Sequence, residues 1–310
     1  MRSLTVSIIL AFLLSLSSSA AEDQHRAKSL AALAKLEGTT AVPFTRTTHP
    51  DAQWFPDAGF GLFMHWGIHS VAGIQPSWAM MEGYPYGTDR REFWGKGYYS
   101  LLTKFNPDRY DPDLWIKAAR DAGMTYAVLT VKHHDGYALW PSEYGDLSTK
   151  RYMNGRDLVG PYIEACRKYG LKVGLYFSPR DWGYPGYPVS LVYGKPYLNP
   201  RTPEQNRADY EKFYAYTVGQ LSEILTRWGK IDLLWFDGMG WAGVNDLRSE
   251  RTLAWVRALQ PGIVLNDRWD GRAGDYRTPE VEMPESAPDG WWENCRSEER
   301  RVGKECRSRW

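Results

Sequence analysis

Five short apolar runs recur along the chain, and stretches with helical periodicity separate them. A continuous apolar run of this length is typical of a strand that is buried on both faces, as in a parallel sheet. The stretches between the runs end at glycine or proline, where helices commonly stop. This alternation predicts repeated βα units. The expected strands are 60–67, 126–132, 172–178, 233–238 and 262–268, and the expected helices are 111–122, 157–170, 204–228 and 246–260.

The next question is whether these units form a closed barrel or an open sheet. The chain has no Rossmann glycine fingerprint, so we expect a (β/α)8 barrel of the TIM type rather than an open doubly wound sheet. The five units and a further strand near Trp291–Cys295 amount to about six of the eight units of a complete barrel. We therefore predict an α/β barrel that is incomplete at its C-terminus. Segments 68–110 and 179–203 are rich in Tyr, Pro and Gly and are expected to form loops over a binding face.

The two ends of the chain are expected to lie outside this fold. Residues 1–20 combine Arg2, a short apolar segment and a small-residue cleavage site, which together predict a secretory signal peptide. A retained N-terminal anchor is the alternative. Residues 296–310 show neither strand nor helix periodicity and resemble the translation of a common sequencing adapter. A solvated basic tail is the alternative for this segment.

We therefore divide the chain into a signal peptide (1–20), a truncated barrel domain (21–295) and a non-native tail (296–310). The protein is expected to be exported to a secreted, periplasmic or lysosomal location, and no membrane association is expected of the mature chain. If the tail is an artefact, the native chain continues beyond Cys295. The 310-residue chain by itself is then expected to show low or no activity.

Charge and aromatic content narrow the class of partner. The 38 Lys and Arg residues balance 37 Asp and Glu, and a net charge of +1 offers no basic surface for nucleic acid. Aromatic residues make up 15% of the chain and include 15 Trp and 20 Tyr. Because Trp and Tyr combine a flat apolar ring with a polar atom, this surplus favours a site for an amphipathic ligand such as a sugar. A Trp-rich core is the alternative explanation.

Polar residues stand at the end of every expected strand. His65 ends the first run, segment 132–136 (KHHDG) ends the second, and Asp237 ends the fourth. The carboxyl ends of barrel strands meet on one face, so these side chains are expected to line a common pocket. The third run contains Tyr176 and leads to Ser178, Asp181 and Trp182, and the fifth leads to Asn266, Asp267 and Arg268.

Asp237 is the strongest candidate for chemistry in this pocket. It directly follows the apolar segment 233–236, so its carboxylate is expected to be held rigidly beside aromatic rings, as a nucleophile or general base requires. The alternative is a structural aspartate that caps the following helix. Asp232, at the opposite end of the same strand, is expected to be structural.

The histidines of the pocket leave three interpretations open. His65 and the pair His133–His134 can bind a metal ion, as histidines at strand ends do in amidohydrolase-type barrels, although adjacent strand residues point to opposite faces. They can instead form hydrogen bonds to ligand hydroxyls, which is the interpretation we prefer and which requires no metal. One of the pair can also be a core histidine that is satisfied within the protein.

Several segments, in this order, resemble the α-L-fucosidases of glycoside hydrolase family 29. The resemblance runs from about Trp54 to Cys295. It implies a retaining exo-glycosidase that releases terminal α-L-fucose from fucosylated glycans, with a catalytic barrel followed by a C-terminal β-domain and no metal or cofactor. That β-domain is absent from the chain as printed. The matching segments are FGLFMHWGIHS (60–70), DPDLWIKAARDAGMTYAVLTVKHHDGYALW (111–140), GLYFSPRDW (174–182) and LLWFDG (233–238).

The resemblance also implies roles for individual residues. Asp237 matches the catalytic nucleophile, and Glu293, in a WE motif followed by Cys295, matches the acid/base residue. Retaining glycosidases hold two such carboxyl groups about 5–5.5 Å apart. The pKa of Glu293 is expected to be raised by its neighbours Trp291 and Trp292, while Asp237 stays ionised. The residues that match contacts to the sugar are His65, Trp78, His133, His134, Tyr176, Trp235 and Arg268.

The chain departs from the family pattern in one stretch. Many members carry a Glu–Trp pair after the first strand, whereas segment 75–80 (QPSWAM) keeps Trp78 without the Glu, which bears on how strictly fucose is preferred. Two alternative functions remain beside the glycosidase. They are a sugar-binding pseudoenzyme, which the presence of Asp237 and Glu293 disfavours, and a metal-dependent barrel hydrolase.

Overall fold

The structure is a computed structural model. It describes residues 45–195, 198, 201–238, 241, 249–269, 273–279, 284–286 and 288–295, with the single positions 24, 27, 28 and 31. The predicted signal peptide and the predicted non-native tail therefore lie outside the described residues. In the part of the chain that is described, no helix is both long and apolar enough to cross a membrane.

Five parallel strands form the central sheet, in the same order in which they occur along the chain. Each of them lies within one of the five predicted strands, so these predictions are confirmed. Sequential parallel order is the arrangement of a barrel, whereas a doubly wound sheet reverses its order. The expected fold class, an incomplete α/β barrel, is thus confirmed. The strands are β1 (Gly61–Met64), β2 (Tyr126–Lys132), β3 (Lys172–Phe177), β4 (Leu233–Phe236) and β5 (Val264–Leu265).

Two further strands of two residues each form a second, two-stranded sheet. β6 (Tyr276–Arg277) and β7 (Trp291–Trp292) pair in parallel with each other, and a parallel bridge between Asn266 and Tyr276 connects β6 to the end of β5. The sequence predicted a single strand here, near 291–295, and the structure adds β6. Only one of the two residues of β6 is buried, so no apolar run marks it in the sequence.

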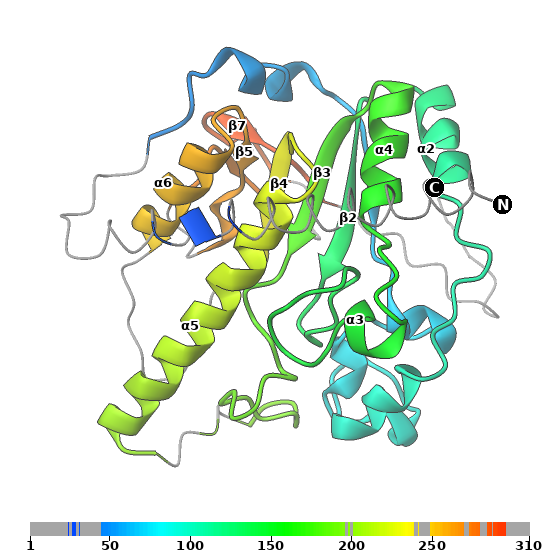
Figure 1. The fold of residues 1–310 in the computed structure, drawn as a ribbon, viewed down its shortest axis with the longest axis vertical. Coiled ribbons are helices and arrows are strands. Elements are labelled where there is room, and N and C mark those ends of the chain that lie inside the picture. Colours follow the sequence, from blue (N-terminus) through cyan, green and yellow to red (C-terminus); the bar gives the residue numbers. More distant parts are fainter. Residues whose placement is uncertain are drawn as a thin grey trace, which may run out of the picture.

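Helices connect the strands and cover the outer face of the sheet. α2 (Pro112–Asp121) packs against α4 (Gly160–Tyr169), and α5 (Pro203–Thr226) packs against α6 (Ser249–Leu259), as Figure 1 shows. These four helices match the predicted ones to within three residues at each end. The short helix α3 (Thr149–Tyr152) lies in the connection after β2. The 3-10 helices are η1 (Pro50–Ala52), η2 (Phe55–Asp57), η3 (Ile68–Val71), η4 (Trp78–Met80), η5 (Arg91–Phe93), η6 (Gly95–Leu101) and η7 (Asp267–Trp269).

Local signals explain where these helices begin and end. At the start of α2, the carboxylate of Asp111 accepts a hydrogen bond from the backbone N–H of Asp113. At the start of α5, Thr202 and Gln205 form a reciprocal capping box. α4 ends at Gly170, whose φ of 74° lies in the left-handed region that favours glycine.

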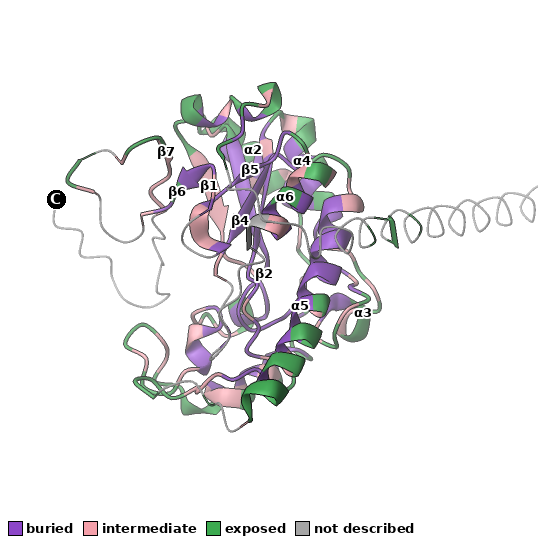
Figure 2. Ribbon diagram, turned by 90° about the vertical axis from the view of Figure 1, so that its left-hand side faces the viewer, coloured by how far each residue is buried: buried purple, intermediate pink, exposed green. Residues whose placement is uncertain are grey.

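Alternate side chains of the strands build two separate cores. Val131, Leu175 and Phe236 point outward and pack under the helices. Residues of the opposite parity, which include Val128 and Trp235, point into the barrel. There they meet 52–58, a segment that lies across the amino ends of the strands (Figure 1). Figure 2 shows that β2 and β4 are buried, that β1, at the edge of the sheet, is of intermediate burial, and that exposed residues lie on the outer sides of the helices and in the loops. With the amino ends covered, the carboxyl ends of the strands are where a ligand can reach the interior.

A buried carboxylate on α5 anchors the connection that follows β2. Glu223 accepts hydrogen bonds from Trp140 Nε1 at 2.9 Å, from the Ser142 hydroxyl at 2.7 Å and from the backbone N–H of Glu143 at 2.8 Å. All three donors lie on one short loop. Glu223 therefore links the helix after β3 to the loop after β2.

The substitution Glu223→Ala is expected to lower the free energy of unfolding by about 2–5 kcal/mol, because buried donors lose their acceptor. Glu223→Gln should lower it less, since the amide oxygen still accepts. Urea denaturation followed by circular dichroism measures both. Glu164→Ala, on the exposed face of α4, is the control. Equal stability of the Glu223→Ala and Glu164→Ala variants would contradict the anchoring role.

Candidate active site

Asp237, directly after β4, lies at the centre of the polar cluster at the carboxyl ends of the strands. The Tyr176 hydroxyl donates to its Oδ2 at 2.6 Å, and Arg268 Nη1 donates to its Oδ1 at 3.1 Å. His134 Nε2 lies 3.4 Å from Oδ2. Among the described residues, the partners of Asp237 are thus side chains of the pocket. Its side chain remains 23% exposed, so a ligand can reach it.

Both adjacent histidines reach this pocket, because β2 ends at Lys132 and both follow it. The His133 ring stacks on Tyr176 with centroids 5.4 Å apart, and the rings of His133 and His134 lie 4.3 Å apart. His65, after β1, contacts His133 at 5.6 Å and Tyr176 at 5.5 Å between ring centroids. Neighbouring residues within a strand point to opposite faces, but His133 and His134 lie beyond the end of β2, so both side chains can face the same pocket.

Burial keeps these histidines uncharged at neutral pH. Burial lowers the pKa of His65 to about 4, although the negative charge of Asp237 opposes this shift. The pKa of His133 and that of His134 are lowered well below the ordinary value, mainly by burial. The positive charge of Arg180 lowers the pKa of His134 further. Each neutral imidazole offers one N–H donor and one lone pair.

Ser178 positions the His134 ring by a hydrogen bond at Nδ1. Its Oγ lies 2.6 Å from that nitrogen and 3.0 Å from the backbone oxygen of Arg180, and the direction of the bond to the ring depends on the tautomer of His134. His134 Nε2 faces the carboxylate oxygen Oδ2 of Asp237 at 3.4 Å. When the hydroxyl proton of Ser178 goes to Arg180, Nε2 carries a lone pair, and a donor between it and Oδ2, such as a ligand hydroxyl or a cation, stabilises the two acceptors.

Ser77 supports His133 from the other side of the pocket. Its Oγ lies 2.6 Å from His133 Nδ1 and accepts from the backbone N–H of Asp135 at 2.7 Å. Ser77 is fully buried, and its φ of 53° lies in the left-handed region that a non-glycine residue rarely adopts. Strain of this kind is characteristic of functional sites. Nothing in the sequence pattern pointed to Ser77.

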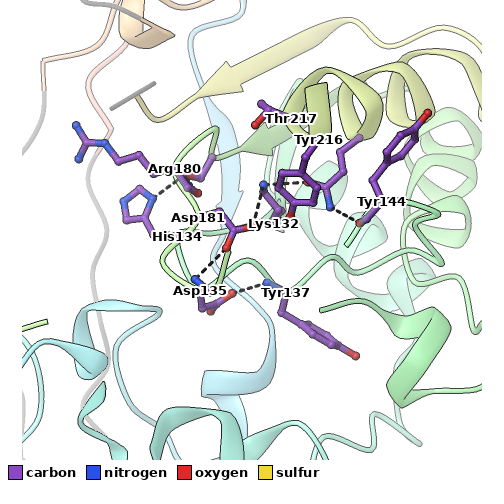
Figure 3. A network of polar contacts seen from close by, with 12 residues as sticks. Lys132, His134, Asp135, Tyr137, Tyr144, Arg180, Asp181, Tyr216 and Thr217 are labelled. Atoms are coloured by element: carbon purple, nitrogen blue, oxygen red, sulfur yellow. Dashed lines mark hydrogen bonds and ion pairs between the residues drawn. The ribbon is translucent and has the colours of Figure 1, made fainter. Parts of the chain in front are cut away.

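A buried ion pair stands behind the turn at 133–136. Lys132 Nζ lies 3.6 Å from Asp181 Oδ2, and the Tyr216 hydroxyl donates to the same oxygen at 2.5 Å (Figure 3). Burial lowers the pKa of Lys132 to about 8, against the opposing effect of Asp181. Gly136 has a φ of 80°, and a Cβ there would lie 2.2 Å from Asp181 Oδ1. The turn that carries the histidines therefore requires glycine.

Glu293, directly after β7, is held by two side chains from the interior of the barrel. The Tyr126 hydroxyl donates to its Oε1 at 2.6 Å, and Trp235 Nε1 donates to its Oε2 at 3.0 Å. Burial raises the pKa of Glu293, and these hydrogen bonds oppose the shift. The direction agrees with the prediction, and burial is the largest cause of the shift. Tyr126 begins β2, so the strand-end pattern did not indicate it.

Arg268 and Trp235 join the two carboxylates into one cluster. The Arg268 guanidinium lies over the Trp235 ring, 4.8 Å from its centroid, and donates to Asp237. Trp235 in turn donates to Glu293. At the end of β6, the Thr278 hydroxyl accepts from Arg268 Nε at 2.8 Å and orients the guanidinium.

Trp78, in η4, completes the predicted set. Its ring meets the His134 ring edge-on at 5.5 Å and the Trp182 ring edge-on at 5.2 Å. The nine predicted residues are thus joined by a continuous series of contacts, while their roles stay a prediction. Trp182 and Ser178 also lie here, and their position after β3 in the sequence was the signal that could have added them to the set.

Three residues of the pocket could also hold a metal ion. His133, His134 and Asp237 each place one ligand atom within 4.8 Å of the others, and this is the metal-ligating group found among the described residues. Two imidazoles and a carboxylate form a donor set that suits zinc. A metal ion bound by these residues would lie between His134 and Asp237, where a ligand hydroxyl could lie instead.

Comparisons with known proteins point to one family. The family model for alpha-L-fucosidase matches residues 35–302. Tissue alpha-L-fucosidase of Rattus norvegicus is 30% identical over 275 residues, which are 81% of this chain and 55% of that protein. Alpha-L-fucosidase isoenzyme 1 from Paenibacillus thiaminolyticus is structurally similar, with a TM-score of 0.63 and 32% identity over 78% of this chain and 59% of that one.

A second solved structure is a glycoside hydrolase family 29 alpha-L-fucosidase from Bacteroides thetaiotaomicron trapped as a covalent intermediate. It has a TM-score of 0.64 and 26% identity, over 81% of this chain and 60% of that one. The chain spans about half the length of the curated relatives that it matches.

We expect His134 to be neutral with its proton on Nδ1, because the Ser178 hydroxyl can give its proton to the Arg180 oxygen and accept from the ring, and we expect His65 to stay neutral down to about pH 4. Two-dimensional ¹⁵N–¹H spectra of histidine-labelled protein measure both properties. Ser178→Ala removes the acceptor and should shift His134 towards the Nε2–H form, which can donate to Asp237. Unchanged His134 nitrogen shifts in this variant would contradict the assignment.

Proposed function

The chain belongs to the alpha-L-fucosidase family, and on this premise we propose that the protein is a retaining exo-glycosidase that releases terminal α-L-fucose from fucosylated glycans. The observation that carries the proposal is the contrast between two carboxyl groups in one cluster. Asp237 is ion-paired with Arg268, whereas burial raises the pKa of Glu293. A retaining glycosidase needs one ionised and one protonated carboxyl group, and unequal environments supply both.

In the first step, we propose, a carboxylate oxygen of Asp237 attacks the anomeric carbon of fucose while the glycosidic bond breaks. Glu293 gives its proton to the departing glycan oxygen, and a fucosyl ester of Asp237 forms. In the second step Glu293, now ionised, takes a proton from water. The water oxygen attacks the anomeric carbon and Asp237 leaves as a carboxylate. Two inversions return the original anomeric configuration.

The polar groups around Asp237 suit the ring hydroxyls of a sugar. With the His134 proton on Nδ1, a hydroxyl placed between His134 Nε2 and Asp237 Oδ2 would donate to one of these facing acceptors and relieve their repulsion. Such a contact is strengthened when positive charge develops on the sugar in the transition state. The partly exposed ring of Trp78 can pack against the apolar parts of the sugar, whereas Trp235 is buried between Tyr176 and Arg268.

A metal-dependent hydrolase is the second candidate, because one group of ligands can be assembled from His133, His134 and Asp237. Such a metal would be bound by Asp237, the carboxylate that acts as the nucleophile in the glycosidase proposal. Treatment with EDTA separates the two, since a glycosidase of the proposed mechanism keeps its full rate. We also propose export, on the signal-like pattern of residues 1–20, which lie outside the described part of the chain.

In the full-length protein, the substitution Asp237→Gly is expected to lower the rate of hydrolysis of a chromogenic α-L-fucoside by about 10³-fold or more, because the nucleophile is lost. Added azide should restore part of the rate and form β-fucosyl azide, since it attacks from the side that Asp237 vacates. Asp57→Asn, exposed in η2, is the control. A full rate in Asp237→Gly, or a rate abolished by EDTA in the wild type, would contradict the proposal.

Glu293 sets the alkaline limb of the pH profile in this proposal. Its raised pKa means that the acid form persists to higher pH than in a free glutamate, so kcat/KM falls as pH rises through that pKa. Glu293→Gln should flatten this limb and lower kcat/KM by about 10²–10⁴-fold for glycans with poor leaving groups.

A leaving group that departs without a proton should be affected much less. Azide added to Glu293→Ala should yield α-fucosyl azide, the anomer opposite to that from Asp237→Gly. An unchanged alkaline limb in Glu293→Gln would assign the acid role to another residue.

A further inference from the structure

Exposed tyrosines gather on two loops beside the pocket. Seven large hydrophobic side chains are exposed among the described residues, and five of them lie on the connections that follow β1 and β3, including Tyr86, Val192 and Tyr193. Tyr86 is 68% exposed and Tyr193 is 52% exposed. Single exposed apolar residues are ordinary, but a cluster of aromatic rings on a surface marks a binding site.

The two loops are fixed to each other through the backbone. One follows β1 and the other follows β3, and a parallel bridge pairs Glu82 with Val192. The N–H of Glu82 donates to the oxygen of Leu191 at 2.7 Å, and the N–H of Tyr193 donates to the oxygen of Glu82 at 2.8 Å. The tyrosines thus stand on a preorganised support, which reduces the conformational entropy lost when a ligand binds.

A continuous series of ring contacts connects these tyrosines to the pocket. Tyr193 and Tyr86 meet the Tyr84 ring edge-on, at 5.3 Å and 6.0 Å between centroids. Tyr84 stacks on Trp78 at 4.6 Å, and Trp78 meets His134 at 5.5 Å. Three successive ring contacts therefore separate each exposed tyrosine from His134, the residue that faces the nucleophile.

We propose that Tyr86 and Tyr193 form a stacking subsite for a pyranose ring of the glycan from which fucose is removed. The proposal rests on the proposed function. The amino ends of the strands are covered by the segment around Phe55, so a glycan attached to bound fucose leaves through the carboxyl-end face, which these two loops border. The C–H faces of a pyranose pack on aromatic rings, and phenol hydroxyls add polar contacts at the rim.

The test compares a small chromogenic fucoside with the fucosylated oligosaccharide that the full protein hydrolyses fastest in a panel of fucosyl-lactoses and fucosyl-N-acetylglucosamines. Tyr193→Ala and Tyr86→Ala should each lower kcat/KM for the oligosaccharide by about 5- to 30-fold, as expected for the loss of one stacked ring. The chromogenic fucoside should change by less than about twofold, because it does not reach the loops.

Two controls separate stacking from other effects. Phe60→Ala removes an aromatic ring of similar exposure (53%) at the amino end of β1 and should leave both substrates unchanged. Tyr193→Phe keeps the ring and should stay close to wild type on the oligosaccharide. In the Asp237→Asn background, Tyr193→Ala should weaken calorimetric binding of the oligosaccharide but not that of fucose.

Three results would overturn the subsite. They are equal losses on both substrates, no loss on the oligosaccharide, and a wild type that cleaves the chromogenic fucoside but no oligosaccharide of the panel. Failure of the proposed function gives a different result, in which the wild type hydrolyses neither kind of substrate and Asp237→Asn binds no fucose.

Discussion

The alternation of side chains along parallel strands is the constraint on which the rest of this structure depends. Because neighbouring residues point to opposite faces, residues of one parity pack under the helices, and those of the other parity fill the barrel. Tyr176 and Trp235 belong to the second group. Tyr176 donates a hydrogen bond to Asp237, and Trp235 donates one to Glu293. The apolar core and the polar site are therefore built from the same strands, and the site inherits the rigidity of the sheet.

Unequal surroundings then differentiate the two carboxyl groups. Arg268 pairs with Asp237 directly, whereas Glu293 is enclosed by aromatic side chains that donate neutral hydrogen bonds. Burial without a bonded cation favours the protonated form of a carboxyl group, and a neighbouring guanidinium favours the ionised form. Arg268 and Trp235 also connect the two groups, so a change in the position of either would alter both environments at once.

The sequence predicted the strands and helices well where each carries its own local signal. Apolar runs mark β1 to β5, and caps such as Asp111 and Thr202 mark helix ends. β6 was not predicted, because a strand of two residues is too short to show a run or an alternation of apolar residues. The contact between Tyr126 and Glu293 was not predicted either, because the two residues are 167 positions apart in the chain and only the curvature of the sheet brings them together.

Local sequence signals were enough to predict the order of the βα units and the polar residues at strand ends, and the family resemblance proposed roles for both carboxyl groups. Their environments emerged only from the folded chain: which side chains enclose Glu293, which groups contact His134, and which tyrosines stand on paired loops beside the pocket. The difference is one of range. Propensity and periodicity act over a few residues, whereas burial, charge and hydrogen bonding depend on neighbours that the fold collects from distant parts of the chain.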